Sequence, residues 1–391
     1  MQISEKIDRI TPSMTLAINA RAQELRAEGA DIISLAVGEP DFPTPEFIRE
    51  AAKKAIDDNF TRYTPVAGIP ELREAAANYF RRYYRTPVKP ESIIIGAGGK
   101  QCLYTFLQTT LNPGDEVLIP SPYWVSYPDM TLLADGKPVF VKTGPETGYK
   151  VAPLTLEDYA TDRTKVLILN SPSNPTGAVY SDREFMNIMR WALARNIYVL
   201  SDEIYDQLIY PPATMTSAIT WFEHCPEFVG VVNGLSKSFA MTGWRVGFMA
   251  AHPEIIKKMS VVQGHSLSNV CSIAQKAALA ALAGPDEPVK EMRRIFEKRR
   301  DLAMERIGTW KNVRCPRPDG AFYLFVDASA YYNGERRDSI QFCQWLLDKA
   351  HVAVVPGAAF GDDRCFRISF AVGDDRLREA LERIGEALED A

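Results

Sequence analysis

Lys237 and its neighbours have the residue types and spacing for covalent chemistry with an aldehyde. Hydroxyls flank the lysine at Ser236 and Ser238, and a fixed cation, Arg245, follows eight positions later. The apolar run 228–232 precedes this loop and predicts a short buried strand. A lysine there could hold an aldehyde cofactor as an imine, while a serine and the arginine bind the cofactor's phosphate. For the tripeptide alone, a solvated loop lysine is the simpler interpretation.

Polar residues at three other predicted strand ends could serve the same ligand, because ligands of open α/β sheets bind beyond the carboxyl ends of the strands. Gly98 and Gly99 precede a predicted helix, where free N–H groups suit a phosphate, although a tight structural turn fits equally well. Asn174 projects an amide from the rigid loop S-P-S-N-P-T-G. Asp202, with Tyr205 three positions on, is either a helix N-cap or a carboxylate that keeps a ring nitrogen protonated.

Taken together, these groups predict one ligand. Phosphate donors, an acid for a ring nitrogen, an amide and a phenol for a ring oxygen, and an imine-forming lysine are what pyridoxal 5'-phosphate requires. The glycine turn lacks the third glycine of the dinucleotide-binding pattern, because position 101 is Gln. A nicotinamide-dependent enzyme is therefore not indicated.

The elements that must position these residues alternate between helices and short apolar runs, which predicts an α/β fold with a mostly parallel sheet. Thr44 is expected to cap a helix that opens with Pro45. The predicted strands of this part are 92–95, 116–119, 166–169, 198–200, 228–232 and 245–250. The C-terminal hundred residues predict a smaller α+β layer with strands at 321–326, 351–355 and 365–370.

Two domains are expected from this organisation. A boundary near Pro285 to Pro288 separates the layers, and a long charged helix follows it. We expect a large cofactor-binding domain of residues 45–284. Residues 1–44 and 285–391 would form the small domain.

The composition is that of an ordinary soluble globular protein. Apolar residues make up 46%, charged residues 24%, and the net charge is -5, which disfavours nucleic-acid and anionic-membrane partners. Six cysteines include no C-x-x-C pair and four histidines show no ligand-like spacing, so we expect no metal site and no disulfide framework. Because no stretch reaches ~18 uninterrupted apolar residues, and the N-terminus lacks an apolar leader, we expect a cytoplasmic protein.

Motifs that contain the candidate residues run along nearly the whole chain. In order they are P-S-M-T at 12–15, A-V-G-E-P-D-F at 36–42, Y-T-P-V-A-G-I-P-E-L-R at 63–73, G-G-K-Q at 98–101, S-P-Y-W-V-S-Y-P at 121–128, N-P-T-G at 174–177, S-D-E-I-Y at 201–205, S-K-S-F-A-M-T-G-W-R-V-G at 236–247 and R-I-S-F at 367–370. With this series the chain resembles the class I aminotransferases, fold type I of the pyridoxal-phosphate enzymes. It is most similar to the bacterial aspartate aminotransferases of the Ib subgroup.

The resemblance implies reversible transfer of an amino group between L-aspartate and 2-oxoglutarate, in two half-reactions. Lys237 would bind the cofactor as a Schiff base and act as general base and acid, with Asp202 on the ring nitrogen. Asn174 and Tyr205 would bond to the ring oxygen, and Trp124 would stack on the ring. The phosphate would be held by residues of two subunits of a homodimer: Gly98, Gly99, Ser236, Arg245 and the partner's Tyr63.

A second set of residues would bind the substrate, an amino acid or a 2-oxo acid. The resemblance implies that Arg367, helped by the Gly38 backbone, takes the α-carboxylate as a bidentate pair. Trp124 and Asn174 would also contact the substrate. The distal carboxylate of a dicarboxylic substrate would face Lys100, Ser13 and Thr15.

Alternatives remain at single residues and for the whole chain. Trp124 could be a core aromatic, and Arg367 could be an ion-pair partner in a strand. Relatives often carry a cation before the P-S-x-T motif, where this chain has Thr11, which weakens the expectation of tight binding of large dicarboxylates such as prephenate. The runner-up functions are a prephenate or broad-range aromatic aminotransferase of the same family and a non-catalytic pyridoxal-phosphate-binding sensor. Because every catalytic position is filled, we expect an enzyme.

Overall fold

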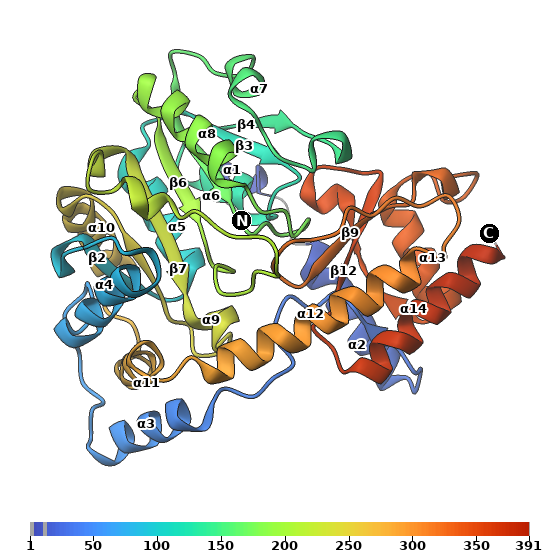
Figure 1. Cartoon of the computed structure of the whole chain (residues 1–391), viewed down its shortest axis with the longest axis horizontal. Helices are drawn as coiled ribbons and strands as arrows, with labels where there is room; N and C mark the ends of the chain where they lie inside the picture. The colour runs from blue at the N-terminus through green and yellow to red at the C-terminus, as the bar shows by residue number, and fades with distance from the viewer. Residues whose placement is uncertain (1–3, 11–13, 391) are drawn as a thin grey trace.

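A seven-stranded sheet forms the centre of the structure, a computed structural model that describes residues 4–10 and 14–390 (Figure 1). The strand order is β2-β8-β7-β6-β5-β3-β4. Strand β8 runs antiparallel to both of its neighbours, and all other adjacent pairs are parallel. The predicted α/β class with a mostly parallel sheet is confirmed. The strands are β2 (Ile93–Gly96), β3 (Glu116–Ser121), β4 (Lys137–Lys142), β5 (Thr164–Asn170), β6 (Tyr198–Asp202), β7 (Val229–Gly234) and β8 (Gly247–Ala250).

Helices cover both faces of this sheet because alternate strand residues point to opposite sides. In β5, Leu167 and Leu169 belong to one buried cluster, and Val166 and Ile168 belong to the other. The first face is covered by α4 (Pro70–Tyr84), α8 (Asp182–Ala194) and α11 (Ser272–Ala283), and α3 (Glu46–Asp57) packs against α11. The second face is covered by α5 (Gly99–Thr110), α6 (Ser126–Leu133) and α10 (Pro253–Ser266).

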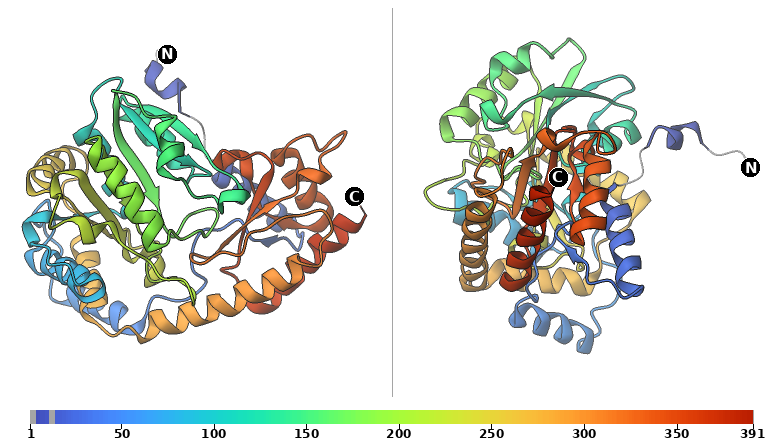
Figure 2. Two further views of the ribbon diagram at one scale, coloured as in Figure 1. Left: turned by 45° about the horizontal axis from the view of Figure 1, so that its top comes forward. Right: turned by 90° about the vertical axis from the view of Figure 1, so that its right-hand side faces the viewer.

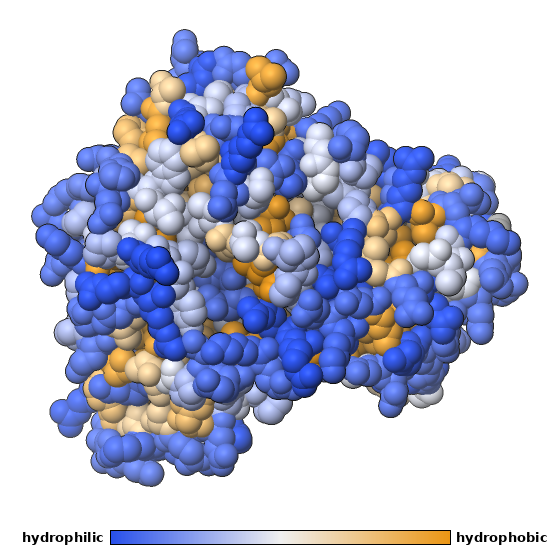
Figure 3. All heavy atoms as spheres, in the orientation of Figure 1, coloured by the Kyte–Doolittle hydropathy of each residue, from blue (hydrophilic) through white to orange (hydrophobic). Residues whose placement is uncertain are grey.

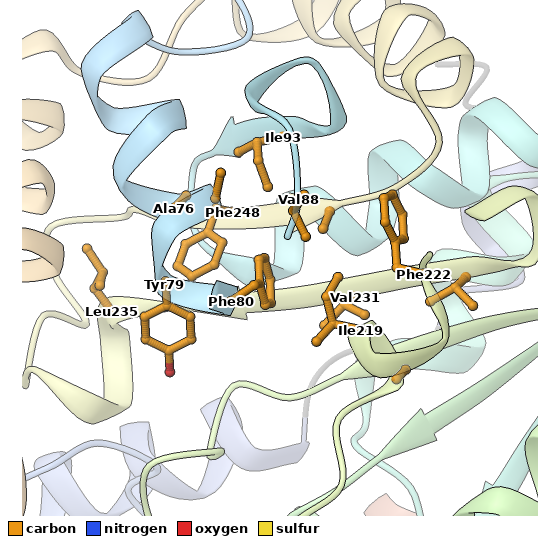
Figure 4. Packing of buried hydrophobic residues seen from close by; sticks show 14 of the residues in the cluster. Ala76, Tyr79, Phe80, Val88, Ile93, Ile219, Phe222, Val231, Leu235 and Phe248 are labelled. Carbon is orange, nitrogen blue, oxygen red and sulfur yellow. The ribbon is translucent and has the colours of Figure 1, made fainter. Parts of the chain in front are cut away.

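Aromatic packing joins helix α4 to the sheet. Phe80 of α4 packs edge-to-face against Phe248 of β8, with ring centroids 5.7 Å apart (Figure 4). Both rings are buried, and burial of a phenylalanine side chain stabilises a fold by roughly 1.5–3 kcal/mol. This contact holds β8, the strand that follows the lysine loop, in place.

A smaller layer lies beside the large sheet (Figures 1 and 2). It contains an antiparallel sheet of order β11-β12-β9 and a parallel pair in which β1, near the N-terminus, joins β10. The long helix α12 runs from the large sheet to this layer (Figure 2). The elements of the smaller layer are β1 (Ile33–Ser34), β9 (Tyr323–Asp327), β10 (Val352–Ala353), β11 (Val355–Pro356), β12 (Cys365–Ser369), α2 (Met14–Ala27), α12 (Glu287–Ile307), α13 (Ser339–Ala350) and α14 (Asp374–Glu389). The predicted domain division at residues 45 and 285 stays a prediction.

A buried arginine of α12 anchors the N-terminal segment that leads into the site. Arg299, 6% exposed, donates to Asp41 at 2.7 Å and to Asp374 of α14 at 2.7 Å. Two carboxylates offset the cost of burying one guanidinium. The segment before α3 is therefore tied to both α12 and α14.

Three sequence predictions of local structure are wrong. The single strand predicted at 351–355 is divided between β10 and β11, which belong to different sheets. Arg245 precedes β8 rather than opening it, because its backbone is left-handed (φ 56°) and cannot continue a strand. Thr44 does not cap α3, whose N-cap is Pro45. Its hydroxyl instead donates to Ala240 O at 2.7 Å and accepts from Trp244 Nε1 at 3.0 Å, which fastens it to the lysine loop.

The surface view shows hydrophobic atoms in small separate patches on a mostly hydrophilic face (Figure 3). Within residues 4–10 and 14–390, no helix is long and apolar enough to cross a bilayer. The described part of the chain also holds no cluster of three or more His, Cys, Asp or Glu side chains arranged for a metal ion.

Candidate active site

A cavity of about 370 Å³ lies where strands β5, β6 and β7 end and helix α5 begins. Parallel strands bring their carboxyl ends to one edge, so residues far apart in sequence meet there. The smaller layer closes the other side with Tyr323 and Arg367. The predicted residues that line the cavity are Gly38, Gly99, Lys100, Trp124, Asn174, Asp202, Tyr205, Ser236, Lys237, Arg245 and Arg367.

Two of the predicted residues that the structure describes, Gly98 and Tyr63, do not line this cavity. Gly98 lies one residue outside it, and a Cβ placed there would be 2.7 Å from Arg245 Nη2. Tyr63 is 90% exposed on the surface. Ser13 lies outside the described residues, and the side chain of Thr15, a residue of α2, is likewise not described. The structure therefore brings together most of the predicted site within one chain.

Lys237 lies in α9 (Leu235–Ser238), the short helix after β7. Its Nζ donates to Gly38 O at 2.6 Å. Burial lowers the pKa of Lys237 to about 8; the carboxylate of Glu39 opposes this, and the charges of Arg367 and Arg245 add to it. An amine with a pKa so close to neutrality is suited to take and return protons.

Asp202 is held at the end of β6 by two donors. Its Oδ2 accepts from Tyr127 Oη at 2.7 Å and its Oδ1 accepts from the Ile204 N–H at 3.3 Å. Burial raises the pKa of Asp202 to about 6, while these hydrogen bonds and the charge of Lys237 oppose the rise. A protonated ring nitrogen placed beside this carboxylate would supply a positive charge, which stabilises the ionised form of the buried Asp202.

The next residue, Glu203, belongs to the core and not to the cavity. It is fully buried, and its Oε1 accepts from Ser201 Oγ and from the Ala218 N–H, both at 2.8 Å. Its Oε2 accepts from Ser217 Oγ at 2.5 Å. Burial raises the pKa of Glu203 to about 8 despite these donors. The two adjacent acids therefore serve different parts of the molecule.

The glycine turn before α5 forms an anion-binding corner. Gly98 is the N-cap with φ 83°, a left-handed conformation that favours glycine, and Gly99 is the first helical residue. Strand β8 passes so close that a Cβ at Gly247 would lie 2.5 Å from Gly99 N. The first N–H groups of a helix have no partner within it, so the corner offers donors and a positive dipole.

A cation and a hydroxyl complete this corner. The Arg245 guanidinium donates to Thr242 O at 3.0 Å and to Ala97 O at 3.2 Å, which holds it beside the turn. Ser236, 6% exposed, precedes Lys237 and lines the same cavity. This set of donors fits a phosphate.

Arg367 is a buried cation held by neutral acceptors. It is 3% exposed, donating from Nη1 to Asn174 Oδ1 at 3.0 Å and from Nη2 to Ala36 O at 2.7 Å. Its Nε has no hydrogen-bond partner within the described chain, and no ion pair to Arg367 is found there. The ion-pair interpretation is not supported, and a carboxylate ligand would satisfy both charge and donor.

Lys100 of α5 lies beside Trp124, which precedes α6, and both residues line the cavity. Lys100 Nζ lies 4.8 Å from the centroid of the Trp124 ring. Burial, followed by the charge of Arg245, lowers the pKa of Lys100. Trp124 lines the cavity and meets Tyr127 edge-to-face, with centroids 5.4 Å apart, so it is not solely a core residue.

Three residues of the site carry polar contacts that the sequence did not single out. Tyr127 donates to Asp202, as described above. Tyr323 Oη lies 2.8 Å from Tyr205 Oη. Asn170 accepts from the Asn174 N–H at 2.8 Å and donates to Asp202 O at 2.9 Å, so it joins two strand ends. Asn170 and Tyr127 stand beside or within quoted motifs, which was the available signal; Tyr323 lies in an apolar strand that gave none.

The donor set fits pyridoxal 5'-phosphate. One cavity is lined by the anion-binding corner, the carboxylate of Asp202, the amide of Asn174, the phenol of Tyr205 and the amine of Lys237. The guanidinium of Arg367 also has an Nε–H without a hydrogen-bond partner in the described part of the chain. Lys237, Asp202, Asn174 and Tyr205 would hold the aldehyde and ring. The individual roles of these residues stay predictions.

Comparison with known proteins gives concordant results. The family model for aminotransferase class I and II matches residues 30–384. An aspartate/prephenate aminotransferase of Cereibacter sphaeroides is 46% identical, with 98% of this chain and 97% of the relative covered. An aspartate aminotransferase of Bacillus subtilis is 42% identical, with 100% and 99% covered. The solved aspartate aminotransferase of Thermus thermophilus with maleate is 42% identical, with a TM-score of 0.94, 99% of this chain and 100% of that chain covered.

Proposed function

Because the chain belongs to the class I and II aminotransferases, we propose that it transfers an amino group between L-aspartate and 2-oxoglutarate. It is an enzyme that uses pyridoxal 5'-phosphate, as its family and its relatives named aspartate aminotransferase indicate. The observation that carries the proposal is one cavity in which Lys237 stands with two cations, Arg367 and Lys100. Two cations match the two carboxylates that aspartate and 2-oxoglutarate share.

The proposed chemistry divides between the cofactor and the chain. When bound, pyridoxal 5'-phosphate supplies an aldehyde that captures the amino group and a ring that accepts electrons from the substrate Cα. Lys237 moves the proton between the substrate Cα and the cofactor's aldehyde carbon. Asp202 keeps the ring nitrogen protonated, and Asn174 and Tyr205 orient the ring through its oxygen.

Substrate selection follows from charge. Arg367 takes the α-carboxylate that every amino acid carries, in a bidentate pair. Lys100 forms no ion pair within the described part of the chain, so the distal carboxylate of aspartate would give it an opposite charge. Burying that carboxylate without a partner would be unfavourable, which favours dicarboxylic over monocarboxylic substrates at this site.

The first test is an absorption spectrum of the purified protein, repeated after adding L-aspartate alone and then L-alanine alone. We expect aspartate to convert the bound cofactor to its amine form far more readily than alanine does. Lys100→Ala should reduce turnover of aspartate about 10–100-fold and leave that of alanine nearly unchanged, because it removes one charge-assisted contact of roughly 1.5–3 kcal/mol. Equal losses for both amino acids would show that Lys100 does not select the substrate.

A second candidate is amino transfer to prephenate. Relatives at 46% and 42% identity are named aspartate/prephenate aminotransferase and probable aspartate/prephenate aminotransferase. Prephenate carries two carboxylates, which suits the same pair of cations. Thr11, where relatives often have a cation, lies outside the described residues. Turnover with aspartate as donor and prephenate as acceptor, measured beside 2-oxoglutarate, would decide between the two acceptors.

We further propose that the enzyme is a homodimer whose site is shared. An apolar groove of about 750 Å³, lined by Trp244, Leu267 and Val270, adjoins Arg245 at the phosphate corner. The 90% exposure of Tyr63 supports a place in a partner's site. Light scattering should give the mass of two chains, and Tyr63→Phe should weaken cofactor binding; a monomer at micromolar concentration would contradict the proposal.

A cytoplasmic location is proposed from the thiols. All six cysteines fall within the described part of the chain and are free. Free thiols persist in reducing compartments and tend to pair in oxidising ones. Fractionation of the native cells that placed the protein outside the cytoplasm would contradict this.

A further inference from the structure

Tyr323 touches three of the groups assigned above to cofactor or substrate. It is 1% exposed and lines the cavity from the smaller layer. Its hydroxyl oxygen lies 2.8 Å from Tyr205 Oη, and the guanidinium carbon of Arg367 lies 4.4 Å from its ring centroid. A Cβ at Gly38 would lie 2.8 Å from the same hydroxyl. One side chain therefore contacts residues assigned to the cofactor and residues assigned to the substrate.

Strand pairing explains the contact between the ring and the guanidinium. Strands β9 and β12 are antiparallel, with Arg367 opposite Phe325 and Ser369 opposite Tyr323. Tyr323 and Arg367 are thus diagonal neighbours on one face of the sheet, close enough for long side chains to meet. The ring of Tyr323 forms one wall for the guanidinium, and the ring of Phe360, with its centroid 5.0 Å from the same carbon, forms another.

The hydroxyl of Tyr323 has a separate consequence for Tyr205. The two phenols share one hydrogen bond, and either oxygen can donate. If Tyr205 donates its only proton to the cofactor's ring oxygen, its own oxygen is left as an acceptor. Tyr323 then becomes the donor, and a hydroxyl that accepts a hydrogen bond is a stronger donor itself.

We propose that Tyr323 is a positioning residue: its hydroxyl directs the Tyr205 hydrogen bond toward the cofactor, and its ring holds Arg367 for the substrate's α-carboxylate. This inference rests on the proposed function. It adds a link between substrate binding and cofactor orientation, since one side chain contacts both Arg367 and Tyr205.

Two substitutions distinguish the role of the Tyr323 hydroxyl from that of the Tyr323 ring. Tyr323→Phe keeps the wall for Arg367, so the KM for aspartate should stay within about threefold, while the pH at which the bound cofactor's absorption band changes should rise by about 0.5–1 unit. The rise follows because Tyr205 stabilises the anionic ring oxygen less well. Tyr323→Leu removes both contacts and should also raise the KM for aspartate and for 2-oxoglutarate about tenfold.

A double variant tests whether Tyr323 acts through Tyr205. In a Tyr205→Phe background, Tyr323→Phe should give no further shift in the pH of the band. A full additional shift there, or an unchanged band in Tyr323→Phe alone, would overturn the proposal. Tyr331→Phe is the matched control, because its hydroxyl donates to Lys311 O away from the cavity, and its spectrum should equal that of the wild type.

Failure of this inference and failure of the proposed function give different results. If the wild-type band does not respond to aspartate, the substrate assignment is wrong. If the wild type responds and Tyr323→Phe is indistinguishable from it, only the role of Tyr323 is wrong.

Discussion

Glu203 should make the cofactor-free protein less stable as the pH rises, and Glu203→Gln should remove most of that dependence. The residue is fully buried and receives three donors, from Ser201, Ser217 and Ala218. Glutamine has the volume of a protonated glutamate and keeps an oxygen for Ser201 and Ala218, while its NH₂ group can donate to Ser217. The substitution therefore leaves packing intact and removes only the titration.

The sign and size follow from the pKa. Burial raises the pKa of Glu203 from 4.5 to about 8, so the folded chain binds the proton more tightly than the unfolded chain. Stability from this group is complete below pH 4.5 and is lost as the pH rises toward 8. At ~1.4 kcal/mol per pKa unit the upper bound is ~5 kcal/mol, of which about 3 kcal/mol is lost between pH 5.5 and 8. Asp202, with a pKa raised to about 6, acts in the same direction.

Urea unfolding of the cofactor-free protein at pH 5.5 and pH 8 measures this difference. The midpoint of the wild type should fall between the two conditions by more than that of Glu203→Gln. Glu223→Gln changes an exposed carboxylate a short distance along the chain and should keep the wild-type pH dependence. If Glu203→Gln and the wild type lost stability equally, the carboxyl group would not be the source and the reasoning from burial would be refuted.

Further predictions concern the cavity. Lys237→Ala should reduce turnover by at least ~10⁴-fold, because general acid–base groups contribute about 10²–10⁴-fold and the covalent attachment is lost as well; turnover above trace rates would refute its role. Tyr127→Phe removes a hydrogen bond to a carboxylate worth roughly 1.5–3 kcal/mol, so the pKa of Asp202 should rise by about 1–2 units, measured as a shift in the pH profile of cofactor binding. Gly247→Ala would press a Cβ onto the glycine turn and should weaken cofactor binding about tenfold or more, whereas Gly243→Ala, which has open space around it, should not; equal dissociation constants would contradict the anion corner.

Hydrophobic pattern was sufficient to predict most of the large sheet. Runs such as 166–169 are apolar on both faces, as expected for central parallel strands, and they were placed to within a few residues. Strand β4 was missed, because Phe140 is exposed at the sheet edge and Pro138 interrupts the pattern. Most residues of β4 are only partly buried or exposed, so its sequence differs little from that of a loop.

The site residues that could be predicted are those whose side-chain type itself indicates a chemical role. A lysine, an acid and an arginine at strand ends are unusual enough to be noticed without a structure. Tyr127 and Tyr323 were not, because a buried tyrosine is ordinary in a core and its hydroxyl partner is fixed only by tertiary packing. The 2.6 Å contact between Lys237 and Gly38 O joins residues 199 positions apart and has no local signal.

The strand order of the large sheet has a consequence during synthesis on the ribosome. Strand β2 emerges first of the seven, yet its place is at the edge, beside β8, whose last residue is Ala250. The chain must grow by some 150 residues after Ile93–Gly96 before that neighbour exists. At about 5–20 residues per second this takes roughly 8–30 s, during which a wholly apolar strand has no sheet to join. Nascent chains of this protein should therefore depend on early helix packing, or on a chaperone, to keep Ile93, Ile94 and Ile95 from aggregating.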